Sequence, residues 1–201
     1  MIYIINYGMG NLGSVRNMLK YIGVPSEIVD NPDELGKAEK ILLPGVGSFD
    51  QAMKRIKDCG FLEVLNHKAL KEKVPIIGIC LGMQLLTNGS EEGKLPGLAW
   101  IEAETILFPR NNGLKVPHMG WNSVHPTWPN LLTNNLPEES RFYFVHSYYV
   151  KVNHEENSVL KAEYGIRFDA AIQKDNIFGV QFHPEKSHKY GMQLLKNFAK
   201  I

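Results

Sequence analysis

The chain has 201 residues, 44% of them hydrophobic and 21% charged, which is the composition of a globular protein with a sizeable core. Its 22 basic and 21 acidic residues nearly cancel and form no basic run, so nothing favours a nucleic-acid partner. The apolar stretch at residues 1–5 is too short for a signal peptide or a membrane span. With only two cysteines, Cys59 and Cys80, we expect free thiols and a cytoplasmic location.

Strand-like and helix-like segments alternate through the first half of the chain. Buried apolar runs predict strands at residues 2–6, 26–29, 40–43 and 74–79. Apolar residues at helical spacing predict helices at 12–22 and 61–71, and Asn31-Pro32-Asp33-Glu34 is typical of a helix start. This order predicts an α/β fold of the flavodoxin-like kind, with a mainly parallel central sheet flanked by helices.

The second half of the chain is richer in strands. Alternating and apolar patterns predict them at residues 99–107, 141–145, 148–152, 159–164, 170–173 and 177–182, with some antiparallel pairs. A last helix is predicted near 190–199, whereas the segment around Trp121, between His118 and His125, is typical of a loop. Since no repeat or linker interrupts the chain, we expect residues 1–201 to form one domain.

A glycine-rich turn follows the first predicted strand. Gly8-Met9-Gly10-Asn11-Leu12-Gly13 matches the G-x-G-x-x-G fingerprint of dinucleotide-binding folds, and Asp30 follows the next strand, as the fingerprint requires. A tight turn that lets strand and helix pack closely would use the same glycines. On this pattern alone, both interpretations stay open.

A cysteine lies at a predicted strand-to-helix turn, in Gly78-Ile79-Cys80-Leu81-Gly82. This pattern is that of a nucleophile elbow with Cys in place of Ser, where flanking glycines relieve crowding in a strained turn. The start of a helix stabilises a thiolate, and the Leu81 backbone N–H can face a developing oxyanion. We therefore expect Cys80 to be a nucleophile rather than a buried structural cysteine, and Cys59 to be structural.

A histidine and a glutamate follow the last predicted strand, in Phe182-His183-Pro184-Glu185. Residues two apart in an extended chain point to the same side, so Glu185 can orient the ring of His183. His183 can then activate Cys80 and protonate a leaving amine. Without Cys80, a surface His and Glu at a strand end would be the simpler interpretation.

Five segments, in order along the chain, carry a resemblance to a known family. They are Asn6-Tyr7-Gly8-Met9-Gly10-Asn11-Leu12, Pro44-Gly45-Val46-Gly47-Ser48-Phe49, Gly78-Ile79-Cys80-Leu81-Gly82-Met83-Gln84, Pro117-His118-Met119-Gly120-Trp121-Asn122 and Gln181-Phe182-His183-Pro184-Glu185-Lys186-Ser187. Together they resemble the class I, triad-type glutamine amidotransferases, and within them the glutaminase subunits that serve histidine biosynthesis. The resemblance spans essentially the whole chain, and it also accounts for the glycine-rich turn.

The resemblance implies a catalytic triad of Cys80, His183 and Glu185 that hydrolyses glutamine to glutamate and ammonia. It assigns oxyanion donors to Val46, Gly47 and Leu81, and the glutamine pocket to Gly45, Gln84, His146, Ser147 and Tyr148. It also assigns a partner interface to Asn11, Trp121 and Lys186. The implied partner is a (β/α) barrel synthase subunit that receives the ammonia through a dry path, in a heterodimer. No cofactor and no metal are expected.

Three alternatives remain open. Residues 187–192 are reminiscent of related glutaminases that feed ammonia to enzymes aminating nucleotide sugars of surface glycans. A non-catalytic dinucleotide-binding module would use the turn between Gly8 and Gly13 together with Asp30. Another Cys-His hydrolase, such as a peptidase, could share the sheet, but neither of the last two classes calls for Gln84 or for the segment 117–122.

Overall fold

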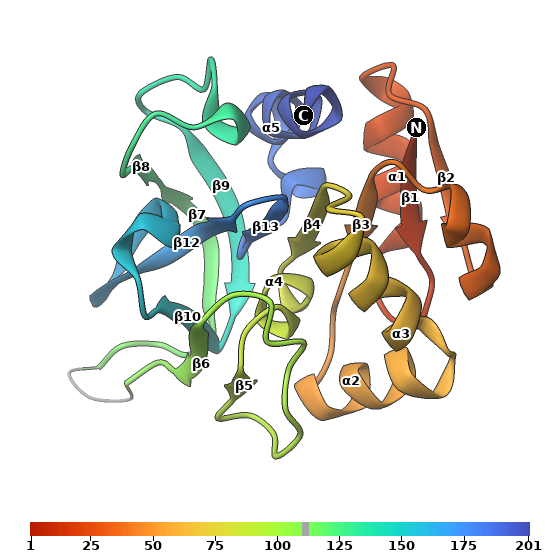
Figure 1. Ribbon diagram of the computed structural model, residues 1–201. Coiled ribbons are helices and arrows are strands. Elements are labelled where there is room, and N and C mark those ends of the chain that lie inside the picture. The colour runs from red at the N-terminus through yellow and green to blue at the C-terminus, as the bar shows by residue number, and fades with distance from the viewer. Residues whose placement is uncertain (110–112) are drawn as a thin grey trace.

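The structure, a computed structural model, describes residues 1–109 and 113–201. A parallel block of five strands forms one side of the main sheet (Figure 1). In spatial order these are β2 (Ser26–Val29), β1 (Ile2–Ile5), β3 (Ile41–Leu43), β4 (Ile76–Ile79) and β13 (Ile177–Val180). In the register of the last two, Ile79 lies opposite Val180, so the residues that follow both strands emerge at the same edge of the sheet.

Mostly antiparallel strands extend this block on the far side of β13, the last two of them forming a parallel pair. The sheet continues through β12 (Ile166–Lys174), β10 (Tyr148–Val152), β6 (Ala103–Leu107) and β5 (Gly89–Ser90), while β11 (Ser158–Tyr164) joins β12 to β8 (His125–Pro126). A separate ribbon pairs β7 (His118–Ser123) with β9 (Arg141–His146). The predicted α/β fold, mainly parallel with added antiparallel strands, is confirmed.

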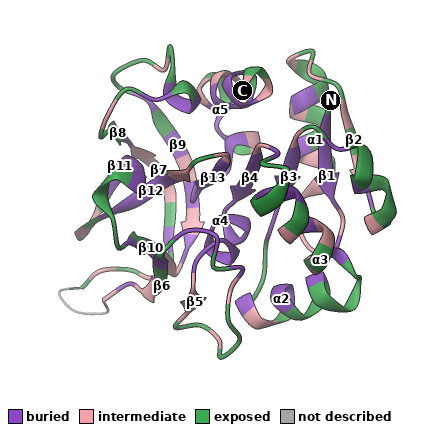
Figure 2. Cartoon of the chain, viewed as in Figure 1, coloured by how far each residue is buried: buried purple, intermediate pink, exposed green. Residues whose placement is uncertain are grey.

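Helices cover both faces of the parallel block. On β1, Ile2 and Ile4 face one apolar cluster, and Tyr3 and Ile5 face the other, as the two-residue repeat of a strand requires. The first cluster includes residues of α1 (Leu12–Tyr21) and α5 (His188–Lys200). The second includes residues of α2 (Phe49–Asp58), α3 (Phe61–Asn66) and α4 (Leu81–Leu85). Figure 2 shows the central strands buried between these layers.

Short helical turns complete the architecture. The predicted helix start at Asn31 opens a 3₁₀ helix, Pro32–Lys37, in which the Asn31 side chain accepts the Asp33 N–H at 3.1 Å. The predicted helix at residues 61–71 is α3 followed by a π-helical turn, His67–Lys71. Further 3₁₀ turns span Leu131–Thr133, Glu155–Asn157 and Pro184–Lys186.

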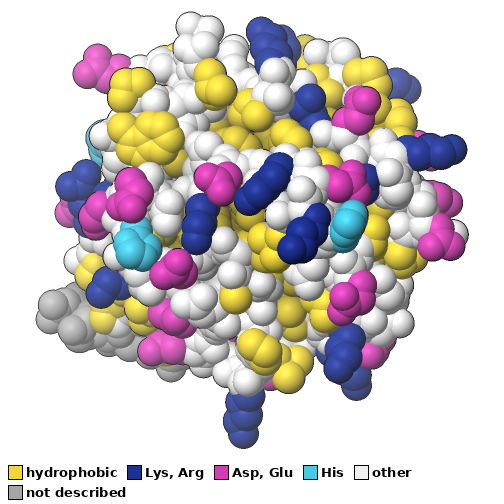
Figure 3. Space-filling view, in the orientation of Figure 1, with side chains coloured by type: hydrophobic (Ala, Val, Ile, Leu, Met, Phe, Trp, Pro, Cys, Tyr) yellow, Lys and Arg dark blue, Asp and Glu magenta, His cyan; other side chains and the backbone are white. Residues whose placement is uncertain are grey.

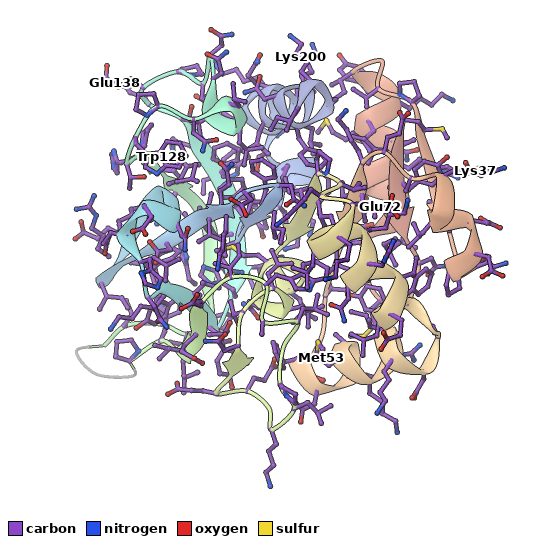
Figure 4. All side chains as sticks on the ribbon, in the orientation of Figure 1. Lys37, Met53, Glu72, Trp128, Glu138 and Lys200 are labelled. Atoms are coloured by element: carbon purple, nitrogen blue, oxygen red, sulfur yellow. The ribbon has the colours of Figure 1, made fainter. Side chains whose placement is uncertain are left out.

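Three sequence predictions were wrong or incomplete. No helix was predicted at α2, although Phe49, Ala52, Met53 and Ile56 recur at helical spacing and are buried; Figure 4 labels Met53 on this helix. The strand predicted at residues 99–107 begins only at Ala103, because Ala99 has a φ of +52° and turns the chain.

The segment predicted as a loop around Trp121 is the strand β7, which pairs residue by residue with β9. Gly120 sits in its middle with a φ of +133°, a conformation that residues with a side chain rarely adopt, although the pairing with β9 continues through it. The strand carries His118 and Trp121, so this correction determines where both side chains lie.

Charged side chains of both signs are mixed on the face of the molecule that Figure 3 shows. Figure 3 shows Lys and Arg interspersed with Asp and Glu over the face in view, with no large area of one sign. Within the part of the chain that the structure describes, every helix is too short or too polar to cross a membrane.

Candidate active site

Cys80 occupies the sharp turn between β4 and α4. Its backbone has φ +55° and ψ −112°, a left-handed conformation that a residue with a side chain adopts only at a cost. A Cβ at Gly82 would collide with the carbonyl oxygen of Leu43, and one at Gly78 with that of Gly82. The two glycines are therefore required by crowding, as the elbow pattern predicts.

His183 and Glu185 lie beside Cys80 because their strand, β13, is the neighbour of β4. His183 ends the extended segment, with its N–H donating to Tyr143 O at 2.9 Å, and Glu185 lies in the 3₁₀ turn that follows. The His183 Nδ1 lies 2.8 Å from Glu185 Oε1, and both side chains are almost fully buried, 3% and 2% exposed. This short contact fixes the ring orientation.

The charge of His183 is set by its neighbours. Burial lowers its pKa, but Cys80 and Glu185 raise the pKa by more than burial lowers it, and the result is a pKa of about 9. Its Nε2 is buried and makes no hydrogen bond of normal geometry among the described residues, although Cys80 is close enough to raise the pKa of the ring. At neutral pH this arrangement favours an imidazolium facing the sulfur.

A cavity of about 350 Å³ opens above the sulfur. Most residues predicted for the oxyanion loop and the glutamine pocket border it, namely Val46, Gly47, Leu81, Gln84, His146, Ser147 and Tyr148. Gly45 stands behind this wall, where a Cβ would lie 2.7 Å from the backbone nitrogen of Gly82. A glycine at position 45 therefore lets the loop approach the elbow.

The loop that contains Gly45 is tied to the first motif of the chain. The hydroxyl of Tyr7 donates to the carbonyl oxygen of Pro44 at 2.6 Å, and this ring is completely buried. Burial raises the pKa of Tyr7, and the nearby Cys80 adds to this rise, so the hydroxyl stays a donor. Sequence analysis assigned Tyr7 no role; its partner, 37 residues away, is visible only in the fold.

Glu92 is the most informative cavity residue that sequence analysis missed. Its Oε2 accepts the N–H of Phe49 at 2.8 Å, and so caps α2, whose own N-cap Ser48 makes no side-chain bond. In return, Asp50 accepts the N–H groups of Lys94 and Leu95 at 2.9 and 3.0 Å. These contacts hold a carboxylate at the cavity, where a cationic group of a ligand would be attracted. Pro117 and Val145 also border the cavity unpredicted.

Two buried histidines form a hydrogen-bonded pair behind the cavity. His118 Nδ1 lies 2.9 Å from His146 Nε2, and His146 Nδ1 lies 2.7 Å from Tyr148 O. Because that carbonyl only accepts, His146 carries its proton on Nδ1 and receives one from His118. Burial lowers the pKa of His118 to about 4 and that of His146 to about 3. Both rings are therefore neutral at pH 7.

Two of the three residues predicted for a partner interface lie together. Tyr143 joins them, because the Trp121 ring packs edge-on against it at 6.3 Å and Lys186 Nζ lies 5.7 Å from its centroid. The Trp121 side chain is also stacked on His188 and is 40% exposed. Asn11, at the start of α1, is half-buried and makes no hydrogen bond or ring contact with this group in the described residues.

The glycine-rich turn near the N-terminus lacks the packing that a dinucleotide fingerprint demands. A Cβ at Gly8 would collide with the side chain of Arg55, and one at Gly10 would lie 3.1 Å from Pro44. Gly13, whose counterpart in the fingerprint lets helix and strand pack closely, is exposed and has open space around it. Gly10 instead serves the contact between the first turn and the Pro44 loop, and Gly8 makes room for the Arg55 side chain.

This site combines a strained cysteine, a buried His-Glu pair and a cavity. Comparison of the whole sequence with known families identifies the class of protein to which it belongs. Residues 3–201 match the family described as glutamine amidotransferase class-I, and the chain belongs to that family.

Individual relatives are more specific. The chain is 54% identical over 200 residues to imidazole glycerol phosphate synthase subunit HisH 2 of Methanococcus maripaludis, covering 100% of this chain and 99% of that protein. It is 47% identical to the protein of the same name from Pseudomonas aeruginosa, with both chains fully covered.

Solved structures agree on the fold. A crystal structure of a glutamine amidotransferase superposes with a TM-score of 0.78 at 15% identity, over 100% of this chain and 99% of that one. The structure of PurLQS from Thermotoga maritima gives a TM-score of 0.74 at 18% identity, with 99% and 97% coverage. At these identities the likeness concerns the fold alone.

Proposed function

We propose that this chain is the glutaminase subunit of an imidazole glycerol phosphate synthase, with residues 1–201 forming one glutaminase domain. The observation that carries the proposal is the strained Cys80 beside the buried His183–Glu185 pair at the wall of a ligand-sized cavity. The relatives that share about half of its residues over their full length bear that enzyme's name. Both cysteines are free, which suits a reducing, cytoplasmic location.

The chemistry follows from these groups. The Cys80 sulfur attacks the side-chain amide carbon of glutamine, and the carbonyl electrons move to the oxygen. Backbone N–H groups of Leu81, at the open start of α4, and of Val46 or Gly47 stabilise that oxyanion. His183 gives its proton to the nitrogen, the C–N bond breaks, and ammonia leaves a γ-glutamyl thioester. Water then attacks while His183 takes a proton, the S–C bond breaks, and glutamate leaves.

The cavity has the polar groups that an amino-acid substrate needs. Glutamine carries an α-ammonium, and Glu92 offers an anionic oxygen at the cavity wall, with Gln84 on the same lining. Ser147 and the backbone beside Tyr148 complete the wall and can receive the α-carboxylate and the rest of the chain. An amide substrate without an α-ammonium would give Glu92 no counter-charge in the cavity, so we expect free glutamine to be preferred over peptides.

We further propose that the barrel synthase subunit docks around Trp121 and Lys186, with Asn11 at its margin. An exposed tryptophan held by Tyr143 and His188 is the kind of rigid aromatic anchor that interfaces use. A direct path into the partner would keep ammonia from being protonated in water, where it would lose its nucleophilicity.

The first test is glutamate release from glutamine, measured with and without the barrel synthase subunit and its ligand. We expect release that the partner strongly stimulates and that Cys80→Ala abolishes. Cys59→Ala is the matched control, because Cys59 is free but exposed and remote in the fold from the cavity. Hydrolysis that depends on Cys80 but ignores this partner would point to a glycan-pathway acceptor. No hydrolysis, with Cys80 inert to a glutamine-like electrophile, would reject the catalytic proposal altogether.

A further inference from the structure

Gln181 is a fully buried polar residue that the mechanism above does not use. It follows β13 directly, and its backbone N–H donates to Ala170 O at 2.9 Å. Its side chain lies between two residues of the candidate site, Gln84 and Cys80. A buried carboxamide is costly unless both of its ends are satisfied, so the direction of each end carries information.

The orientation of this carboxamide follows from Gln84. The Gln84 Nε2 donates to Gln181 Oε1 at 3.1 Å and also lies 3.3 Å from the carbonyl oxygen of Tyr148. The Gln84 group that faces the Tyr148 carbonyl oxygen must be the donor, its NH₂, so the Gln181 atom that faces the same NH₂ must be the acceptor, its carbonyl oxygen. Its Nε2 is thereby directed at the Cys80 Sγ, 3.8 Å away. Flipping either amide would set nitrogen against nitrogen or oxygen against oxygen.

The Cys80 sulfur has a second polar neighbour, which favours the neutral thiol rather than the thiolate. The carbonyl oxygen of Val145 lies 4.0 Å from Sγ, where it can accept from a thiol but repels a thiolate. The N–H of Gln181 does the reverse, since a donor gains most when the acceptor is ionised. Within the buried site, Gln181 therefore counters the carbonyl and complements the imidazolium of His183.

We propose that Gln181 is a further catalytic residue, whose carboxamide donates a hydrogen bond to the Cys80 thiolate. This role rests on the proposed function, because it concerns the nucleophile of that reaction. The same donor serves both halves of the reaction. It holds the thiolate before attack, loses most of its interaction while the sulfur is in the neutral thioester, and regains it when the thiolate leaves.

The hydrogen bonds from Gln84 to Gln181 and from Gln181 to Cys80 also link the substrate pocket to the nucleophile. Gln84 borders the cavity and at the same time holds the oxygen of Gln181. Removing its amide therefore loosens Gln181 even in the absence of substrate. Gln84→Met should weaken the thiolate in the same direction as a change at Gln181, but by less.

The test measures how fast iodoacetamide alkylates Cys80 as a function of pH, in a Cys59→Ser background so that only one thiol reacts. Gln181→Met removes the donor at similar volume, and Gln181→Glu keeps the oxygen for Gln84 but sets a carboxylate against the sulfur. We expect the midpoint of the alkylation profile to rise by about one pH unit in Gln181→Met, equivalent to a tenfold loss of thiolate, and by more in Gln181→Glu. Gln193→Met is the matched control and should leave the profile unchanged, because this α5 side chain donates to Asn197 and makes no hydrogen bond with the site among the described residues.

A midpoint in Gln181→Met that equals that of the control would overturn the proposal, even if glutamate release fell. If either variant fails to fold, the unaltered protein still decides. The side-chain NH₂ signals of Gln181 should then shift with the same midpoint as the alkylation rate, and signals that ignore that midpoint reject the hydrogen bond. Failure here would leave partner-stimulated, Cys80-dependent glutamate release intact, so it is distinguishable from failure of the proposed function.

Discussion

Buried histidines occur at two places around the cavity, and at neutral pH one of them is charged while the other two are neutral. His183 has a pKa raised to about 9, whereas His118 and His146 have pKa values lowered to about 4 and 3. Burial lowers the pKa in all three cases. The difference lies in the partners, because His183 faces a carboxylate and a sulfur, whereas the described hydrogen-bond partners of the other two rings are each other, a carbonyl and an amide.

The comparison shows how one site can hold a proton carrier next to a fixed scaffold. The imidazolium of His183 also helps to keep His146 neutral, since like charges repel. A neutral pair with fixed tautomers positions Tyr148 by hydrogen bonds, while the charged residue is free to give and take a proton. The predictions below test whether partners, rather than burial, make this difference.

The largest effect is expected from Glu185→Gln, which removes the charge beside His183 and keeps the shape. The pKa of His183 should fall, and glutamate release should drop by about a thousandfold or more, as when the carboxylate of a related triad is neutralised. Steady-state kinetics and the ring nitrogen signals of His183 measure both. Glu104→Gln, at an exposed carboxylate that binds Asn88, is the control. Activity within tenfold of the parent would show that Glu185 is not needed to orient the ring.

The second prediction concerns the pH dependence of unfolding. His118 and His146 bind protons in the unfolded chain below pH 6.5 but not in the folded one until about pH 4 or 3, so stability should fall as the pH drops through this window. His183 is the reverse case: its contribution is fully present below pH 6.5 and is lost as the pH rises through about 9.

Urea unfolding across pH should therefore give a maximum near pH 6.5, with a loss of several kcal/mol on the acid side. Cys80→Ala should flatten only the alkaline side, because it removes a cause of the raised His183 pKa. If Cys80→Ala also changed the stability at acid pH, the His118–His146 pair would not be independent of the nucleophile.

The third prediction tests the neutral pair directly. His118→Phe keeps a ring between Phe144 and Tyr164 but leaves His146 Nε2 without a donor, which should cost about 2 kcal/mol of unfolding free energy. His125→Phe, on the exposed strand β8, should change stability by less than about 0.5 kcal/mol. Equal effects in urea titrations would mean that the His118–His146 bond contributes nothing.

The sequence predicted the charged half of this comparison better than the neutral half. The elbow at Cys80 and the i, i+2 relation of His183 and Glu185 are local patterns, so short segments contain their geometry. Each also sits at the end of a strong apolar run, which makes its strand easy to recognise.

The remaining features arise from contacts between distant segments. His118 meets His146 only through the register of β7 and β9, and β7 was mistaken for a loop because Gly120 and Pro117 interrupt its pattern. Glu92 reaches the cavity by capping α2, a helix that was itself not predicted. A residue that belongs to no motif and whose hydrogen-bond partner lies tens of residues away in the chain cannot be recognised from a single sequence.

The smallest predicted effect concerns the strain at the nucleophile, which the neutral pair does not share. Cys80 holds φ +55° and ψ −112°, a conformation that glycine adopts without the clash of a Cβ. Cys80→Gly should therefore be more stable than Cys80→Ala by about 1 kcal/mol, although both are inactive. The matched pair is Cys59→Gly and Cys59→Ala, because Cys59 has an ordinary φ of −81° and glycine should be the less stable choice there. Urea unfolding of the four variants measures the difference in unfolding free energy between the Gly and Ala variants at each position. If this difference had the same sign at both positions, the backbone at Cys80 would not be strained by a side chain.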